Sequence, residues 1–290
     1  MKESVMAHVT EATNTFIQRP HGRLIRFLLI VDAIFVAGIS LWHYLSLGDP
    51  DYNPKLFQIA VFMGIVAIFG TIFFLAYQLA KARTKFWQEF AAYRNWTYEA
   101  SLNAKPFTGV MFASGRGIHS KRIVNVVSGT DEGRSARIYE YTFSIGHGKH
   151  STSYAYTVFE FSFAGAFPHL YLDCKKDFFS VRPKGELMLP EPYKEHFRFY
   201  APEQYEIEAL AIVDPSLLEF LTNESWIHDL ELIDGRLLVF TQGLIGTLAQ
   251  LEERYAKAKA LALRLAPTLD HSRLAPIGDN PTTLSVGLSF

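Results

Sequence analysis

The 290-residue sequence predicts an α+β protein, with an N-terminal two-helix transmembrane hairpin followed by a cytoplasmic domain of antiparallel sheet plus helices. Three observations predict this class. Two long apolar segments lie near the N-terminus, period-2 alternation begins after Trp96, and helical spacing returns after Ala201. The expected divisions are an N-terminal cytoplasmic segment over 1–23, the hairpin over 24–80, the α+β domain over 81–264 and a flexible tail over 265–290.

The two apolar segments have the length of membrane spans. The first runs from Phe27 to Leu47 with Asp32 as its only formal charge, and the second runs from Leu56 to Leu79 with none. A helix needs about 20 apolar residues to cross the hydrocarbon core, and a core helix of a soluble protein would instead show one apolar stripe. The first segment also exceeds the apolar length of a cleavable signal peptide. We therefore expect two spans, with a helix that continues past the second.

Lysine and arginine placement predicts the orientation. Basic residues flank the outer ends of both segments, whereas the short linker between them holds Lys55 alone; the flanking residues are Arg19, Arg23, Arg26, Lys81, Arg83, Lys85 and Arg94. Basic residues near span ends stay on the cytoplasmic side. We therefore expect a multi-pass inner-membrane protein with both termini in the cytoplasm.

The rest of the chain carries strand and helix signals in succession. Alternating segments before residue 175 predict strands, and Asp234-Gly235 predicts a two-residue hairpin turn. Asp214-Pro215 predicts a helix N-terminus, and apolar residues from Leu244 onward predict a last helix, with a low-order tail from Pro267.

Composition excludes some classes of function. The formal net charge is −1, which lacks the basic excess of a nucleic-acid binder, so no nucleic-acid partner is expected. Cys174 is the single cysteine, so no intramolecular disulfide forms. The sequence holds no dinucleotide, calcium or zinc-protease motif, and we expect neither a cofactor nor a metal.

The stretch "YTFSIGHGKHSTSYAYTV" contains the candidate binding residues His147, Gly148, Lys149 and His150. A phosphate-binding P-loop is excluded because the first glycine, the hydroxyl after the lysine and the following helix are all missing. His147 and His150 would make a two-ligand metal site, which His119 and His169 would have to complete in space. The simpler interpretation is a hairpin tip whose positive, hydroxyl-rich end contacts an anionic partner.

Four stretches resemble a known bacterial family. "GRSARIYEYTFSIGHGKHSTSYAYTVFEFSF", "FPHLYLD", "HFRFYAPEQYEIEALAIVDPSLLEFL" and "LELIDGRLLVFTQ" are similar to membrane-anchored proteins of the domain-of-unknown-function 3137 group. The resemblance covers about Trp96 to Ala258, although Phe197 stands where a second arginine is expected in "HFRF". It implies a bacterial membrane location and no catalytic residues.

Two further residues, Cys174 and Asp32, each allow a functional and a structural interpretation. Cys174 lies beside Lys175 and Lys176, which would favour a reactive thiolate, yet its phase with Leu170 and Leu172 predicts a buried, inert side chain. Asp32 is a carboxylate inside a span, where such groups often handle protons or ions, although it lies within two turns of the cytoplasmic end.

The leading functional hypothesis is a membrane-anchored cytoplasmic binding or scaffold protein. The alternatives are a membrane-tethered enzyme that uses Cys174 or the His147–His150 loop, and an oligomeric transport or stress-response component that uses Asp32. The expected partners are the lipid bilayer and either another copy of the chain, as a homo-oligomer, or another membrane protein.

Overall fold

The structure is a computed structural model that describes residues 20–46, 54–104, 107–112, 118–146, 150–176, 182–273 and residue 284. The chain divides into two compact units, Met1–Phe90 and Ala91–Phe290, which are described separately below. Of the predicted binding loop, His147, Gly148 and Lys149 lie outside the described residues, whereas His150 lies inside them.

The described residues of the first unit form helix α2 (Pro20–Ser46) and most of helix α3 (Pro54–Arg94), whose last turn belongs to the second unit. Apolar side chains in the N-terminal half of α3 face outward, with Phe62, Phe69 and Phe73 between 58% and 73% exposed. Among the described residues, α3 is the helix that is long and apolar enough to cross a membrane, while the apolar part of α2, Ile30–Ser46, is shorter. The predicted continuation of the second segment to Arg94 is confirmed.

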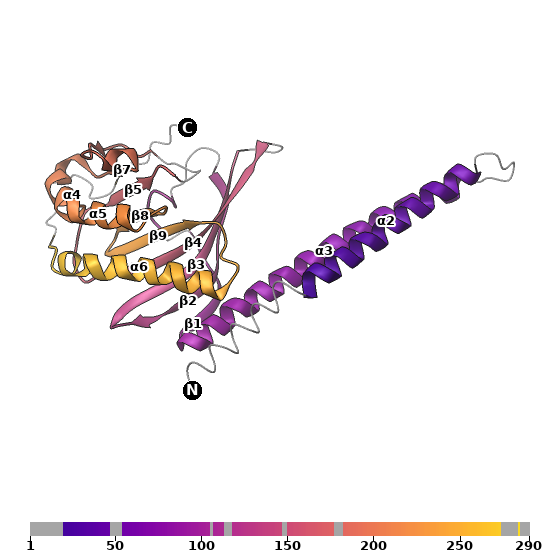
Figure 1. Cartoon of the computed structure of the whole chain (residues 1–290), viewed down its shortest axis with the longest axis horizontal. Coiled ribbons are helices and arrows are strands. Elements are labelled where there is room, and N and C mark those ends of the chain that lie inside the picture. The colour runs from indigo at the N-terminus through magenta and orange to yellow at the C-terminus, as the bar shows by residue number, and fades with distance from the viewer. Residues whose placement is uncertain are drawn as a thin grey trace. The chain divides into compact units, whose positions relative to one another are not determined.

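The two helices lie side by side and run in opposite directions (Figure 1). The ring of His43 in α2 stacks on Phe57 in α3, with ring centroids 4.0 Å apart. About two turns further along each helix, Gly64 faces Phe35 and Ile39 so closely that an added Cβ would lie 3.3 Å from the Phe35 ring. A glycine at this position lets the two backbones approach.

The second unit is built on one nine-stranded sheet in which every neighbouring pair is antiparallel, in the order β1-β2-β3-β4-β9-β8-β5-β7-β6. Its strands are β1 (Thr97–Leu102), β2 (Ile118–Asp131), β3 (Arg134–Ile145), β4 (Thr152–Ser162), β5 (Leu170–Cys174), β6 (Glu186–Leu187), β7 (Phe197–Tyr200), β8 (Asp229–Ile233) and β9 (Arg236–Gln242). The predicted α+β class with a large antiparallel sheet is confirmed.

Three helices cover one face of the sheet (Figure 1): α4 (Glu206–Ile212), α5 (Pro215–Asn223) and α6 (Leu248–Leu269). The Tyr255 ring of α6 packs on Phe159 and Phe161 of β4, at centroid distances of 6.2 and 5.9 Å. Two short 3₁₀ turns, Tyr193–Glu195 and Glu203–Tyr205, flank β7. This face therefore holds a helix-covered hydrophobic core.

The opposite face carries buried tyrosines, and we call it the tyrosine face. Alternate residues of β3, β4, β5 and β7 place their side chains here because successive residues of a strand point to opposite sides; they are Tyr139, Tyr141, Tyr156, Tyr171 and Tyr200, each at most 1% exposed. The segment 107–112, which we call the strap, and Leu284 belong to the same hydrophobic cluster. Irregular chain, rather than a helix, thus contributes to the cover of this face.

Local signals placed most element ends correctly. Asp214 caps α5 by accepting a hydrogen bond from the Leu217 amide at 2.7 Å, and Asp234-Gly235 forms the β8–β9 turn with φ of 51° and 70°. The last helix differs from expectation at both ends. It begins at Leu248 after Thr247, whose hydroxyl accepts from the Gln250 amide at 3.3 Å, and it continues through Pro267 to Leu269.

Candidate functional site

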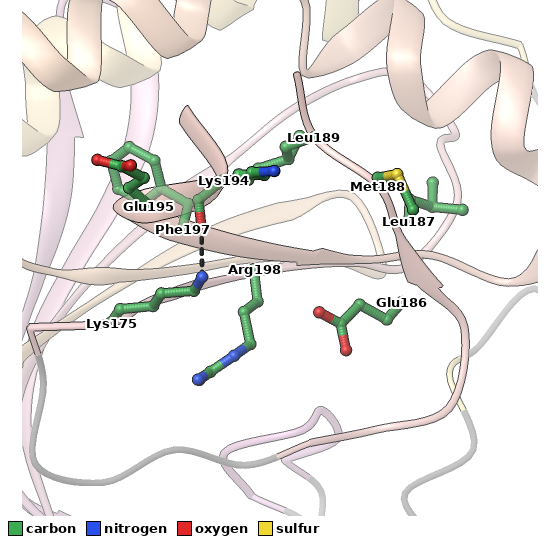
Figure 2. A pocket seen from close by; sticks show the side chains of 9 residues that line it. All are labelled: Lys175, Glu186, Leu187, Met188, Leu189, Lys194, Glu195, Phe197 and Arg198. Atoms are coloured by element: carbon green, nitrogen blue, oxygen red, sulfur yellow. Dashed lines mark hydrogen bonds between the residues drawn. The ribbon is translucent and has the colours of Figure 1, made fainter. Parts of the chain in front are cut away.

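A surface cavity of about 530 Å³ lies at the edge of the sheet formed by β6 and β7 (Figure 2). Its lining combines three kinds of side chain. Lys175, Lys194 and Arg198 are cationic, Glu186 and Glu195 are anionic, and Leu187, Met188, Leu189 and Phe197 are apolar. None of these nine lining residues is a cysteine, serine or histidine.

The cations of this cavity already hold protein partners. Lys175 donates from Nζ to the Lys194 carbonyl, as Figure 2 shows, and Lys194 forms an ion pair with Glu191. Arg198 donates from Nη1 to Asp173 Oδ2 at 2.9 Å. The cavity can therefore accept a polar or zwitterionic group that shares these contacts, and it presents both signs of charge.

Three fully buried carboxylates lie on the neighbouring strands β5 and β8. Asp173 of β5 and Asp229 and Glu231 of β8 are each 0% exposed. Glu231 lies directly opposite Tyr171 in the register, and Asp173 lies opposite Arg198. A buried carboxylate is tolerated only when hydrogen bonds replace its lost hydration, so the donors around each one define what it does.

Asp229 joins β5 to β8 through its two oxygens. The Tyr171 hydroxyl donates to Oδ2 at 3.1 Å, and the Cys174 amide donates to Oδ1 at 2.8 Å. Burial raises the pKa of Tyr171 well above its usual value, and the negative charges of Asp229, Asp173 and Glu231 raise it further. Tyr171 therefore stays a neutral hydrogen-bond donor, which makes it a structural residue rather than a base.

Glu231 holds the strap against the sheet. Its carboxylate accepts from the Val110 amide and, at 3.5 Å, from the Met111 amide. Gly109 has a φ of 129° and an added Cβ there would lie 2.6 Å from Glu231 Oε1, so only glycine brings the strap this close. The Tyr141 hydroxyl donates to the Met111 carbonyl at 3.1 Å and adds a further contact between strap and sheet.

His169, which immediately precedes β5, joins Glu231 to the C-terminal part of the chain. Its Nε2 lies 2.6 Å from Glu231 Oε1, and its Nδ1 accepts a hydrogen bond from the Leu284 amide at 3.0 Å. Because Nδ1 is an acceptor, the proton of the neutral ring is on Nε2, which donates to Glu231. The ring is 3% exposed, so one buried histidine connects Leu284, β8 and the strap.

A separate polar cluster surrounds Asp131 at the β2–β3 turn. Asp131 accepts from the Tyr255 hydroxyl at 2.7 Å and from Lys259 Nζ at 3.0 Å, both on α6, and Arg94 Nη1 lies 3.5 Å from it. Burial alone would raise the pKa of Asp131, but these hydrogen bonds and charges lower it below its usual value. The guanidinium of Arg94 also lies 4.6 Å from the centre of the Tyr255 ring.

The structure separates His169 from the loop that contains His150, two of the histidines that the metal hypothesis would combine. Glu231, the hydrogen-bond partner of His169, lies opposite Leu238 of β9, which lies opposite Glu160 of β4. Glu160 in turn lies opposite Arg137 of β3, so Glu231 and Arg137 are at the same height in the sheet. The loop that contains His150 follows Ile145, eight residues further along β3, which corresponds to roughly 25 Å at the rise of an extended strand. His150 is exposed, and the described residues contain no group of three or more metal-binding side chains.

The remaining predicted site residues lie in ordinary structural surroundings. Cys174 is 2% exposed and lies 3.6 Å through Sγ from the Trp226 carbonyl, so its predicted burial is confirmed. Asp32 is half-buried on α2. His119 lies in β2 opposite Ser144 of β3.

Sequence reasoning missed the buried carboxylates and His169 as a connecting residue. The strands "LYLDC" and "DLELI" are buried at every position, yet Asp229 and Glu231 share one phase of β8 and Leu230 and Leu232 share the other. In a sequence this alternation is typical of a strand with one solvent-facing side, so it does not reveal that the carboxylates are buried. Nor does the pattern reveal which distant segments supply their partners.

Comparison with known proteins gives little further guidance. No protein-family model matches the chain, and no curated protein matches it. Among solved structures, the chain is similar to the crystal structure of the mycobacterial trehalose monomycolate transport factor A, TtfA, with 19% identity and a TM-score of 0.43, over 65% of this chain and 96% of that one. A likeness this weak carries no functional inference.

Proposed function

We propose that this chain is a membrane-anchored protein whose α+β domain serves as a cytoplasmic binding or scaffold module. The observation that carries the proposal is α3, a 41-residue helix whose apolar side chains face outward over its N-terminal half. Exposure of this much apolar surface to water is unfavourable in free energy, and burial of the helix in a bilayer removes that cost. The helix then ends at Arg94, immediately before β1, so the domain follows the anchor without a long linker.

We further propose that α2 crosses the membrane as well, which makes the chain a multi-pass protein of a bacterial inner membrane. The antiparallel contacts of His43 with Phe57 and of Gly64 with Phe35 support a hairpin. The basic residues that flank both outer ends support cytoplasmic termini. The resemblance of the domain to the domain-of-unknown-function 3137 group is part of the same proposal.

A binding role is favoured over the thiol enzyme because Cys174 is enclosed by protein. Its side chain is 2% exposed, which leaves no approach for a substrate to the sulfur. The surfaces we assign to partner contact are the mixed-charge cavity beside β7 and the segment between β3 and β4, whose sequence includes Lys149 and His150. The partners we propose are the bilayer and a second membrane protein or a second copy of this chain.

Protease accessibility tests the proposed orientation. Cells that produce the full chain with an epitope tag at each end would be converted to spheroplasts or to inside-out vesicles. We expect both tags and the domain to resist protease in spheroplasts and to be cleaved in inside-out vesicles. Cleavage of either tag in intact spheroplasts would contradict the two-span, cytoplasmic-domain arrangement.

A further inference from the structure

We infer that the outer edge of β1 is a dimerisation surface, on which β1 of a second copy of this chain pairs antiparallel, so that the sheet continues from one copy into the other. The inference rests on the proposed function, because it names a second copy as the partner of the scaffold module. β1 is the first strand in the order of the sheet, and it pairs with β2 along one edge. Its other edge presents backbone N–H and C=O groups that no described strand binds.

The two end strands of the sheet differ in how they are protected. β6, at the opposite end, is two residues long and Pro190 follows shortly after it, so it is a poor template for a further strand. β1 is six residues long, holds neither lysine nor proline, and keeps a continuous register with β2 from Thr97 to Leu102. Folded proteins usually protect an edge strand by shortness, lysine, proline or a bulge. Because β1 has none of these, we expect another strand to cover it in the assembled protein.

The edge is open to the approach of a second chain. The exposed side chains of β1 are those of Thr97, Glu99, Ala100 and Ser101. Tyr98 and Leu102 are half-buried, since the Tyr98 hydroxyl donates to Asn125 Oδ1 at 3.0 Å and Leu102 packs against the cluster of the tyrosine face. The strand is therefore fixed to its own sheet, and no described segment of the chain covers its exposed side chains.

The symmetry of a dimer restricts the register of the two strands. Opposed residues of an antiparallel pair alternate between hydrogen-bonded and non-hydrogen-bonded types. If a two-fold axis relates the strands, this alternation is preserved only when one residue lies opposite the same residue of the second copy. Glu99 and Ala100 are the two residues nearest the middle of β1, so an axis at either of them gives the longest overlap.

The charge of Glu99 decides between these two registers. An axis at Glu99 would place two carboxylates directly opposite each other, which is unfavourable. An axis at Ala100 instead places Glu99 opposite Ser101, whose hydroxyl can donate to the carboxylate, and Tyr98 opposite Leu102. Each of these pairs occurs twice in the dimer. β1 is thus complementary to itself in charge and shape, which favours a second copy over a different protein.

Disulfide crosslinking in isolated membranes tests the dimer and its register. The full chain with Cys174→Ala would carry one introduced cysteine and be oxidised with copper-phenanthroline. Opposed residues have Cα atoms about 4.5–5.5 Å apart, which a disulfide bridges, whereas diagonal neighbours lie about 7–8 Å apart, at the limit of its reach. We expect Ala100→Cys to form a covalent dimer at least about tenfold faster than Glu99→Cys or Ser101→Cys. Equal rates at the three positions, or no dimer with Ala100→Cys, would overturn the inference.

Mixed chains give a second test of the register. Two chains with different tags, one with Glu99→Cys and one with Ser101→Cys, would be produced in the same cells. These positions lie opposite each other in the proposed dimer, so the mixed pair should crosslink at a rate within about threefold of Ala100→Cys. A mixed pair that crosslinks no faster than either chain alone would contradict the register. A disulfide to a different protein in place of the dimer would contradict the choice of partner.

A charge exchange separates pairing of β1 from chance collision. Ser101→Glu places each introduced glutamate opposite Glu99 of the second copy, so it should slow the crosslinking of Ala100→Cys by at least about fivefold. The further change Glu99→Lys should restore the rate, because each lysine then faces a glutamate. Thr130→Glu, at an exposed position of β2, is the matched control and should leave the rate unchanged. A rate that ignores Ser101→Glu, or that Glu99→Lys fails to restore, would rule out this interface.

The result is separable from the protease test of membrane orientation. If protease cleaves a tag in intact spheroplasts while the crosslinking pattern holds, the proposed orientation is wrong and the dimer stands. If the tags are protected as proposed and the pattern is missing, the dimer is wrong and the membrane-anchored arrangement stands.

Discussion

Single buried side chains determine how the irregular segments of this domain are held. Glu231 is 0% exposed and accepts hydrogen bonds from two strap amides and from His169. A carboxylate suits this role because it is an acceptor at both oxygens, whereas the amide of glutamine would bring a donor into a site made of donors. The strap, Leu284 and strand β8 are therefore linked through one residue.

Replacement of Glu231 by glutamine should destabilise the domain by about 2–4 kcal/mol, because the amide group faces backbone N–H groups and leaves buried donors without an acceptor. Chemical denaturation of the full chain in detergent, followed by tryptophan fluorescence, would measure the change in the free energy of unfolding. Glu253→Gln on the exposed side of α6 is the matched control and should cost less than about 0.5 kcal/mol. Equal effects of the two substitutions would contradict the assigned role of Glu231.

Cys174 should be unreactive in the folded protein. Its thiol is 2% exposed, so a maleimide reagent should label it only after denaturation. An exposed cysteine introduced by Ser101→Cys in a Cys174→Ala chain supplies the rate expected for an accessible thiol, because Ser101 lies exposed on β1. Labelling of native Cys174 at a comparable rate would contradict this expectation and support the hypothesis of an enzyme that uses Cys174.

At the level of elements, the Asp131 cluster connects the last residue of α3, the β2–β3 turn and helix α6. The network draws these three elements together around the Tyr255 ring, on which Arg94 also lies. Several charges that share partners in this way contribute more than an isolated surface ion pair. The cluster therefore holds Arg94, at the end of α3, beside the β2–β3 turn and α6 within the second unit.

Asp131→Asn should lower stability by about 1 kcal/mol at neutral pH, and the difference should disappear in acid. The pKa of Asp131 is lowered in the folded protein, so the carboxylate contributes stability above its unfolded pKa and loses it as the pH falls through the folded pKa. Thermal unfolding from pH 8 to pH 3 should show a constant gap between the two proteins down to about pH 5, then a narrowing gap below about pH 4. A gap that widens in acid would contradict this assignment.

Charged residues at the centre of α3 should reduce the insertion of this helix into a membrane. Arginine at the middle of a span costs about 2.5–3.5 kcal/mol, so Ile65→Arg together with Phe69→Arg should cost about 5–7 kcal/mol of insertion free energy. Both side chains are exposed on α3. Cell fractionation should show a smaller membrane-bound share for this variant than for Gln88→Arg, which lies beyond the apolar stretch. Equal membrane-bound shares of the two variants would contradict the insertion of α3.

For the whole molecule, the sequence was most informative where local chemistry decides the structure. Alternation predicted the strands, Asp214 predicted a helix start and Asp234-Gly235 predicted a hairpin, because each depends on neighbouring residues alone. The second apolar segment was equally clear, since helix α3 continues to Arg94 as expected. These features require no knowledge of distant parts of the chain.

The candidate site was harder to predict because it depends on contacts between distant residues. His169 lies 62 positions from Glu231 and 115 from Leu284, and nothing in local spacing pairs them. The last helix continues past Pro267 to Leu269, although a proline lacks the N–H that would bond the carbonyl four residues earlier and usually marks a helix end. Sequence patterns thus indicated where strands and helices lie, and the fold alone shows which side chains meet.

The central claim is that the apolar helices hold the chain in a lipid bilayer. An alkaline carbonate wash of membranes from cells that produce the full-length chain tests it most directly, because the wash removes peripheral proteins and leaves spanning ones. We predict that the chain stays in the membrane pellet and enters the supernatant only when detergent is added. Its appearance in the supernatant without detergent would contradict the account.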